Sequence, residues 1–462
     1  MADTTIPQIP PHANFASTPS SRGTLEILWS SLFTIFACTW TIQHLNVPEQ
    51  RNVCEPGWRG SVKWYTRKFG TSAKWMMITT IAPEVVIGIA CYDLLAAKII
   101  YRALQTFALE DDVPWTLTHS YFANMGGFVM QSGVPEPLQP PTYTSLEEVP
   151  LSSRSHRESQ AGSSSTFGGK SRNDRNMRRA KPLLSVIAGR WNEISYCNPY
   201  HLTGRQIWQL RKDGILPRLP NISETELADR SKSDSFVKVI ALFQILWATV
   251  QIIVRTARHL VISQLELSVI AFGTCAILMY VLYWSKPKNI GATTTILQFE
   301  GLIPQKVLTR IKGRHTYMGY FLMGDDSTKL RHGSPIRNDA TENYHDDGAG
   351  FWLYPALVFG ATVFGGIHVG AWSFIFPTRY ELILWRVASV YSAACGTVII
   401  LIGVAFDLFE TLEKPRLAIV RSFVFLYITA RLALLVETFR TLFFLPPLAY
   451  VSTWTANIPH FG

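Results

Sequence analysis

The residues of this sequence with the most chemical interest are charged side chains inside long apolar stretches. Glu84 follows Pro83 in one such stretch, and Asp93 lies nine residues further along it. Arg386 and Arg431 lie in two later apolar stretches. A charge surrounded by hydrocarbon is costly unless it faces a partner or a water-filled cavity, so such residues often mark an ion or substrate path. The four charged residues are therefore candidates for an intramembrane polar site.

Pro83 gives Glu84 an unusual backbone environment. Proline lacks an N–H group and kinks a helix, which frees a carbonyl group beside the carboxylate. In a functional interpretation, Glu84 titrates or binds a cation in a conduction or substrate path, with Arg386 or Arg431 as its counter-ion. In a structural interpretation, which the residues favour, a pair between Glu84 and an arginine only fixes the packing of helices.

Two further polar features lie in apolar stretches. Gln244 and Gln251, seven residues apart, share one face of a helix, and hydrogen bonds between helices explain them without a transport role. His368 lies within Gly366-x-x-x-Gly370, a spacing that permits close approach of two helices. A proton relay is one role for His368, and a packed, hydrogen-bonded histidine is the favoured one.

Long uncharged stretches must position these residues. Only 16% of the 462 residues are charged, against about 25% in soluble domains. A helix that crosses a bilayer needs about 20 mainly apolar residues. Seven windows of this kind occur, at 25–45, 75–97, 236–254, 265–284, 351–376, 382–406 and 417–445. The sequence therefore predicts an all-α, polytopic helical membrane bundle of six to eight transmembrane helices.

The segments between these windows differ in composition. The sequence predicts a disordered tail at 1–24, spans within 25–97, 236–284 and 351–445, an amphipathic segment at 98–130, a disordered Pro/Ser/Arg-rich insert at 131–181, a small helical cap at 182–235, an extramembrane loop at 285–350 and a tail at 446–462. Apolar residues recur at helical spacing over 115–129. An interfacial helix and a packed loop that ends at Gly126-Gly127 are equally compatible with that pattern.

The net charge of +10 is concentrated in one tract, because residues 151–181 alone carry a net charge of +6. Beside membrane spans, such a tract suits anionic lipid headgroups better than nucleic acid. The residues proposed to contact lipid are Arg172, Arg175, Arg178, Arg179 and Lys181. A solvated linker without a partner is the favoured alternative. No nucleic-acid partner is expected, and protein partners are not indicated.

Motifs for common chemistries are absent from the sequence. It has no Gly-Lys-Ser/Thr phosphate loop, no dinucleotide glycine pattern, no His-Glu-x-x-His zinc motif and no serine elbow. We therefore assign no catalytic residue, cofactor or metal, and an enzyme is the less favoured class. Basic residues nearly balance on the two faces of the seven-span arrangement, so the orientation stays open.

Several stretches resemble a large family of uncharacterised fungal multi-pass integral membrane proteins. These stretches are ACTWTIQHLNVP at 37–48, Ala82-Pro83-Glu84, WTLTHSYFANMGGFVM at 115–130, Gly366-x-His368 and Ile458-Pro459-His460. The resemblance implies an integral membrane protein of a fungal cell. It implies no activity and no catalytic residues.

We expect a multi-pass membrane protein that acts as a channel or transporter for an ion or small solute. The alternative is a membrane receptor, scaffold or signalling component that acts through its long loops. Polar residues from several spans that converge on a central cavity favour transport, whereas a dry core with isolated ion pairs favours the alternative. The sequence does not indicate which cellular membrane holds the protein.

Overall fold

The computed structural model describes residues 22–50, 57–133, 198–231, 235–311, 315–316, 333–341, 348–408 and 413–453. The described chain is mostly helical. Its long helices are α1 (Thr24–Thr41), α2 (Trp58–Ile81), α3 (Pro83–Glu110), α8 (Ser235–Ala257), α9 (Gln264–Leu282), α12 (Ala349–Val369), α13 (Arg379–Leu408) and α14 (Glu413–Arg440). The insert 134–197, with the predicted lipid-contact residues Arg172 to Lys181, lies outside the described residues.

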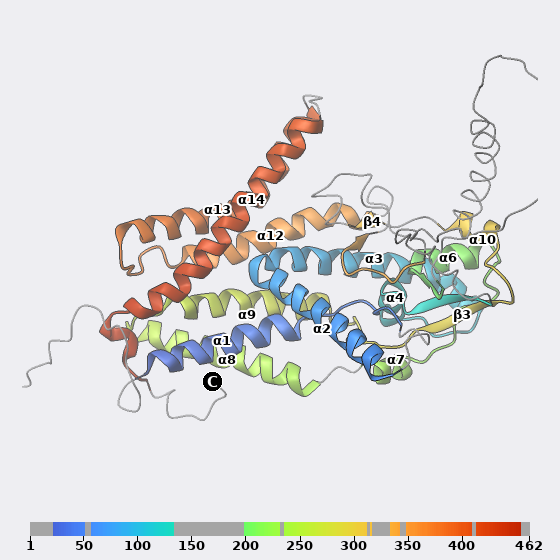
Figure 1. The fold of residues 1–462 in the computed structure, drawn as a ribbon, viewed down its shortest axis with the longest axis horizontal. Coiled ribbons are helices and arrows are strands. Elements are labelled where there is room, and N and C mark those ends of the chain that lie inside the picture. Colours follow the sequence, from blue (N-terminus) through green and yellow to red (C-terminus); the bar gives the residue numbers. More distant parts are fainter. Residues whose placement is uncertain are drawn as a thin grey trace, which may run out of the picture.

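The long helices form one bundle around α9. Figure 1 shows α1, α3, α8, α9 and α12 side by side along the long axis of the molecule, with α14 crossing them obliquely. Helix α9 contacts α1, α3, α8, α12 and α14. Its sequence, QLELSVIAFGTCAILMYVL, is apolar on every side, as expected of a helix enclosed by others.

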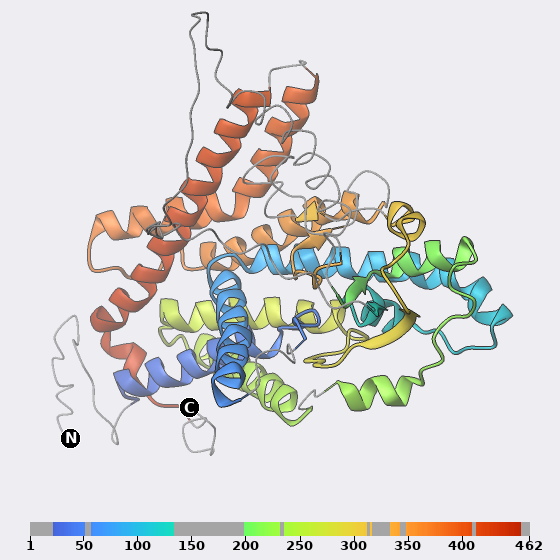
Figure 2. The same ribbon diagram turned by 45° about the vertical axis from the view of Figure 1, so that its right-hand side comes forward.

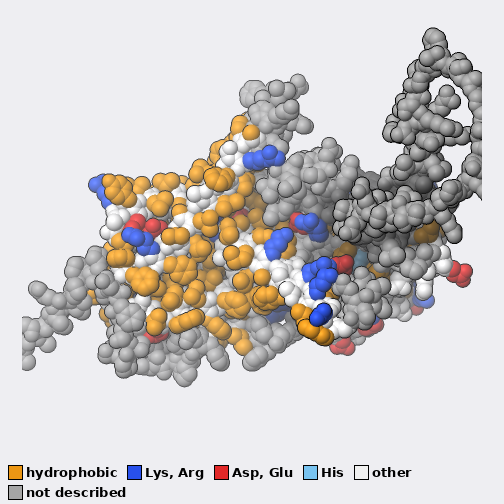
Figure 3. Space-filling model, viewed as in Figure 1, with side chains coloured by type: hydrophobic (Ala, Val, Ile, Leu, Met, Phe, Trp, Pro, Cys, Tyr) orange, Lys and Arg blue, Asp and Glu red, His pale blue; other side chains and the backbone are white. Residues whose placement is uncertain are grey.

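Five of the described helices are long and apolar enough to cross a membrane, namely α8, α9, α12, α13 and α14. They correspond to the last five predicted windows. Helix α1, in the first window, is 18 residues long and is not among the five. Figure 3 shows hydrophobic side chains covering the face of the bundle. Phe425 is 74% exposed and Leu246 62% exposed, which is compatible with a membrane location.

The second predicted window does not form a straight span. Helices α2 and α3 meet at Ala82 with a bend of 111°. In Figure 2, α2 stands nearly at right angles to α3. The proline kink predicted within 75–97 is therefore a complete break, and the two helices together count as at most one further candidate span. Pro83 begins a new helix at a position where its missing N–H costs nothing.

A small α/β unit, here called the sheet domain, covers one end of the bundle. It contains α4 (Leu117–Asn124), α6 (Gly204–Lys212), α7 (Glu224–Arg230), α10 (Gln305–Arg310) and the strands β1 (Phe128–Ser132), β2 (Tyr200–Leu202) and β3 (Thr294–Phe299). Strand β1 is central, antiparallel to β2 and parallel to β3. The smaller elements elsewhere are β4 (His315–Thr316), β5 (Ala340–Thr341) and the 3₁₀ helices η2 (Thr441–Phe444) and η3 (Pro447–Tyr450).

The sheet domain differs from the small helical cap predicted at 182–235, and it adds a strand to the end of the amphipathic segment predicted at 98–130. Helix α4 of this amphipathic segment ends at Asn124, and Gly126 adopts a positive φ of 79°. Residues 128–132 then form a strand, because Phe128 and Met130 are fully buried in the core of the domain. The sequence pattern of a short apolar run after two glycines fits a buried strand as well as a helix or a loop. Only its pairing with β2 and β3 shows that this run is a strand.

Asp111 joins the end of α3 to the sheet domain. Its carboxylate accepts two hydrogen bonds from the Arg211 guanidinium, at 3.0 and 2.7 Å, and one from the Leu219 N–H at 2.8 Å. The Arg211 hydrogen bonds, with help from Leu219, hold the pKa of Asp111 below its usual value. The ionised Asp111 carboxylate therefore holds α6 against α3.

We expect Asp111→Asn to destabilise the sheet domain by about 3 kcal/mol, because the mostly buried Arg211 guanidinium loses the carboxylate that it binds at 3.0 and 2.7 Å. In the wild type, the folded pKa lies below the unfolded value of about 3.9. The stabilisation is therefore complete above the unfolded pKa and is lost as pH falls through the folded pKa. Amide hydrogen exchange in α6 measures the effect. Glu110→Gln is the control, because its carboxylate lies 3.7 Å from the same guanidinium but is 56% exposed and should contribute little; an equal loss of protection in both variants would contradict the assignment.

Candidate functional site

The break between α2 and α3 places two opposite helix ends together inside the bundle. The carboxyl end of α2 carries partial negative charge, and the amino end of α3 carries partial positive charge. The Ile81 carbonyl is the last of α2, and Glu84 lies in the first turn of α3. The break therefore favours a cation at Ile81 and an anion at Glu84, and the residues present match both preferences.

Glu84 is 3% exposed and has one satisfied and one unsatisfied carboxylate oxygen. The Tyr427 hydroxyl donates to Glu84 Oε1 at 2.5 Å. The buried Oε2 atom has no hydrogen-bond partner. A buried carboxylate oxygen without a partner is costly, so it marks a position where a proton, a cation or a hydrogen-bond donor binds favourably.

Arg431 supplies the positive charge at the break. Its Nε donates to the Ile81 carbonyl at 2.8 Å, and its guanidinium lies over the Phe364 ring, 3.9 Å from the ring centre. The side chain is 6% exposed. Its charge acts on the Glu84 carboxylate, although the described ion pairs within 4.0 Å do not include these two residues. Arg431 therefore caps α2 and brings a positive charge to the break.

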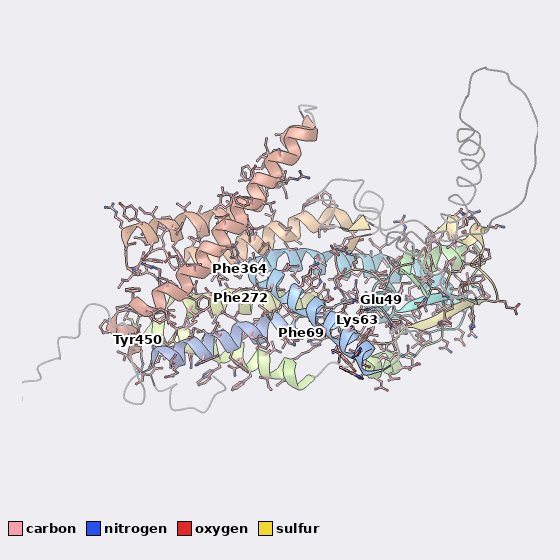
Figure 4. All side chains as sticks on the ribbon, in the orientation of Figure 1. Glu49, Lys63, Phe69, Phe272, Phe364 and Tyr450 are labelled. Carbon is pink, nitrogen blue, oxygen red and sulfur yellow. The ribbon has the colours of Figure 1, made fainter. Side chains whose placement is uncertain are left out.

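His368 stacks on the same aromatic ring. Its imidazole stacks on Phe364 at 4.7 Å between ring centres, and its Nδ1 lies 2.8 Å from the Phe364 carbonyl. That contact assigns the proton to Nδ1, and Nε2 lies 3.4 Å from the Ser268 hydroxyl oxygen. Figure 4 shows Phe364 beside Phe272 at the centre of the bundle. Phe364 therefore links His368 to the polar centre at the break.

Glycines bring the helices of this centre close together. A Cβ on Gly360 would lie 3.0 Å from the Cα and Cβ of Glu84, and a Cβ on Gly365 would lie 2.5 Å from the Ala393 nitrogen. The predicted pair behaves differently, because a Cβ on Gly366 meets nothing within 4 Å and one on Gly370 meets only Ile367 of the same turn. The close approach is therefore made by Gly360 and Gly365, and the predicted role of Gly366-x-x-x-Gly370 is wrong.

Two of the predicted charged residues lie away from the break. Asp93 pairs with the buried Lys286 at 2.6 Å and accepts from the Tyr283 hydroxyl at 3.0 Å. Arg386 donates twice to the Trp372 carbonyl, at 3.0 and 2.8 Å, and stacks on the Trp372 ring at 4.7 Å. Arg386 is therefore not the counter-ion of Glu84, and of the two predicted arginines only Arg431 approaches it.

Gln244 and Gln251 line a different polar hollow, between α1, α8 and α9. Its other polar lining comes from Ser30, Ser31 and Thr34 of α1 and from an ion pair between Arg22 and Glu266 at 2.7 Å. The hollow has a volume of about 20 Å³, enough for about one water molecule. The predicted polar residues thus divide into the centre at the break, which holds Glu84, Arg431 and His368, and this smaller hollow.

Sequence reasoning missed Tyr427, the one hydrogen-bond donor that the structure shows on Glu84. Tyr427 and Arg431 lie four residues apart and therefore share one face of α14. That spacing is the signal by which the tyrosine could have been found once Arg431 was chosen. No group of three or more His, Cys, Asp or Glu side chains suited to a metal ion occurs among the described residues.

The comparisons with known proteins concern the family and not the activity. A family of unknown function, DUF8562, matches residues 3–141 and 202–308, which together make up more than half of the chain. The match includes Glu84 and the strands β1 and β3 of the sheet domain, whereas most of β2, His368 and Arg431 lie beyond it. No curated protein and no solved structure matches the chain. With its broken helix and sheet domain, the chain belongs to the family of unknown function DUF8562.

Proposed function

We propose that the protein is a multi-pass integral membrane protein and that it acts as a channel or transporter for an ion or small solute, with Glu84 as the binding group. The membrane location is supported by the five long apolar helices and their exposed hydrophobic side chains. The resemblance to fungal membrane proteins is compatible with it.

One observation carries the transport proposal, namely a buried carboxylate with a free oxygen at a helix break. Interrupted helices at membrane depth occur where the backbone is buried in protein or lines a cavity. In secondary transporters the ends of such half-helices bind the substrate and the coupling ion. Glu84 lies level with Gly360, near the middle of α12, and Tyr427 and Arg431 lie near the middle of the apolar part of α14. A central position is where a transport site is expected.

A rigid connection to the sheet domain supports a signalling role as a second candidate. Helix α3 begins beside Glu84 and runs without interruption for 28 residues to Glu110, a length of about 42 Å. It packs against α4 and α6 of the sheet domain. A change of charge at Glu84 would then act on the domain through one continuous helix.

The transport proposal is tested by ion flux in liposomes that contain the full-length protein. A trapped pH indicator records proton entry under a potassium diffusion potential, and sodium and potassium release are recorded in parallel. We expect flux above protein-free liposomes, and we expect Glu84→Gln to lower it by at least about tenfold, equivalent to roughly 1.4 kcal/mol in the barrier. The reason is that the amide can no longer exchange a proton or neutralise a cation.

The matched control is Glu110→Gln, the same substitution at the far end of α3, where the side chain is 56% exposed. Its flux should equal that of the wild type. Absence of proton and cation flux in the wild type, or equal flux in the Glu84→Gln variant, would contradict the proposal.

A further inference from the structure

Helix α2 carries a surface that the packing of the bundle does not use. Its basic residues, here called the α2 basic face, are Arg59, Lys63, Arg67, Lys68 and Lys74, and the helix holds no Asp or Glu. Trp75 and Thr79 are its only buried residues. A 24-residue helix with five positive charges and two buried side chains is therefore exposed over most of its length.

Large aromatic side chains are exposed beside these charges. Trp58 is 72% exposed, Tyr65 is 65% exposed and Phe69 is 64% exposed. In water, such a set of exposed rings would promote association between protein molecules. At the boundary of a bilayer the same combination is typical, because tryptophan and tyrosine favour the headgroup level and basic side chains extend toward phosphate.

The basic groups are held close to the rings. Lys68 Nζ lies 5.6 Å from the centre of the Trp64 ring, and Lys74 Nζ lies 5.9 Å from that of Trp75. The ion pair described on this face joins Arg67 to Glu49 at 2.7 Å, with both side chains more than half exposed. An exposed pair of this kind contributes little, and α2 itself carries five basic residues and no acidic residue.

The α2 basic face lies at the border between the apolar bundle and the sheet domain. Figure 4 shows Lys63 and Phe69 on α2 at this border. In Figure 3, drawn in the same orientation, Lys and Arg side chains gather at the edge of the apolar surface where α2 runs. The apolar end of α2, residues 76–81, continues from this edge to the break at Glu84.

We propose that α2 is an interfacial helix whose basic face binds the headgroups of anionic phospholipids in the cytosolic leaflet. The inference rests on the membrane location of the proposed function but not on transport. Anionic lipids are concentrated in the cytosolic leaflet and attract basic segments next to the membrane. The sheet domain then faces the cytosol.

The bend between α2 and α3 also affects how basic residues are distributed between the two sides of the membrane. Because α2 bends by 111° at Ala82, it does not continue the line of α3. Trp64 of α2 donates to the carbonyl of Glu49, in the segment whose Val47 binds Met125 of the sheet domain. Lys98 and Arg102 lie on the part of α3 that leads from the break to the sheet domain. A straight second span would have separated these residues from the α2 basic face. With the bend they add to it, and basic residues are enriched on the cytosolic side of membrane proteins.

The lipid inference is tested with the full-length protein in phosphatidylcholine nanodiscs that contain a trace of spin-labelled phosphatidylserine or spin-labelled phosphatidylcholine. The fraction of label immobilised by the protein gives the preference between the two headgroups. We expect phosphatidylserine to be preferred. Each basic residue near an anionic surface contributes about fivefold, so the triple variant K63Q/R67Q/K68Q should lose the preference. High salt should weaken it in the wild type as well.

The control removes three charges from exposed positions of the sheet domain that lie away from α2, in the variant K212Q/K306Q/R310Q, and should keep the preference. Equal retention of the two labels by the wild type, a preference that survives in the α2 triple variant, or equal loss in the control would overturn the inference. A glycan on the exposed Asn221 of Asn221-Ile-Ser223 would also overturn it, because glycosylation occurs on the luminal side. A protein that does not insert into nanodiscs would instead refute the membrane location itself.

Discussion

Valine in place of Gly365 should prevent normal assembly of the bundle, whereas valine in place of the adjacent Gly366 should leave it folded. A Cβ on Gly365 would lie 2.5 Å from the nitrogen and 2.7 Å from the Cα of Ala393. These are backbone atoms of α13, so no change of side-chain rotamer relieves the overlap. Helices α12 and α13 must move apart, and the loss exceeds the usual overpacking cost of about 1–3 kcal/mol.

Gly366→Val is the matched control for Gly365→Val. Gly366 has the same flanking sequence and the same helix, yet a Cβ there meets nothing within 4 Å. Thermal unfolding in detergent, followed by the monodisperse fraction in size-exclusion chromatography, measures both variants. Similar melting temperatures for Gly365→Val and Gly366→Val would show that α12 and α13 do not pack as described.

Removal of the positive charge at the helix break should have the second large effect. In Arg431→Met the Ile81 carbonyl loses its cap, and Glu84 loses the charge that compensates it. Breaking a buried charge arrangement on one side typically costs about 3–5 kcal/mol. The variant should therefore unfold at much milder conditions than the wild type.

A second substitution separates electrostatics from packing. Glu84→Gln in the Arg431→Met background removes the uncompensated charge and should restore a substantial part of the lost stability. A double-mutant cycle gives the coupling between the two residues, which we expect to reach about 1–3 kcal/mol. Additive effects of the two substitutions would contradict the proposed coupling.

The sequence predicted those parts of the fold that depend on local composition. Five apolar windows correspond to helices suited to crossing a membrane. Pro83 and Glu84 mark the position of the break, because the missing N–H and the buried charge are visible in the residues themselves.

The direction of the chain after Pro83 was not predictable in this way. A proline permits a kink but does not fix its angle. The 111° bend depends on Arg431, more than 300 residues away, which caps Ile81, and on Gly360, which lets α12 approach Glu84. These contacts are tertiary, so no local pattern encodes them.

The sheet domain was missed for the same reason. Strand β1 pairs with β2 and β3, which lie about 70 and 165 residues further along the chain. Its five residues include the apolar run Phe128-Val-Met130, a pattern that helices and strands share over so short a length. For the polar centre, the sequence offered two arginines for Glu84, and only the packing of α14 against the break selects Arg431.

We propose that α2 and α3 enter and leave the bilayer on one face, so that the break holds Glu84 inside the membrane. Single cysteines at Thr66 in α2, Leu109 in α3 and Ser373 after α12, in a background without the six native cysteines, test it most directly. All three positions are exposed. In sealed, oriented vesicles, a membrane-impermeant maleimide should label Thr66→Cys and Leu109→Cys from the same side and Ser373→Cys from the opposite side. Labelling of Thr66→Cys and Leu109→Cys from opposite sides would mean that the pair crosses the membrane as one broken span, and the account would be contradicted.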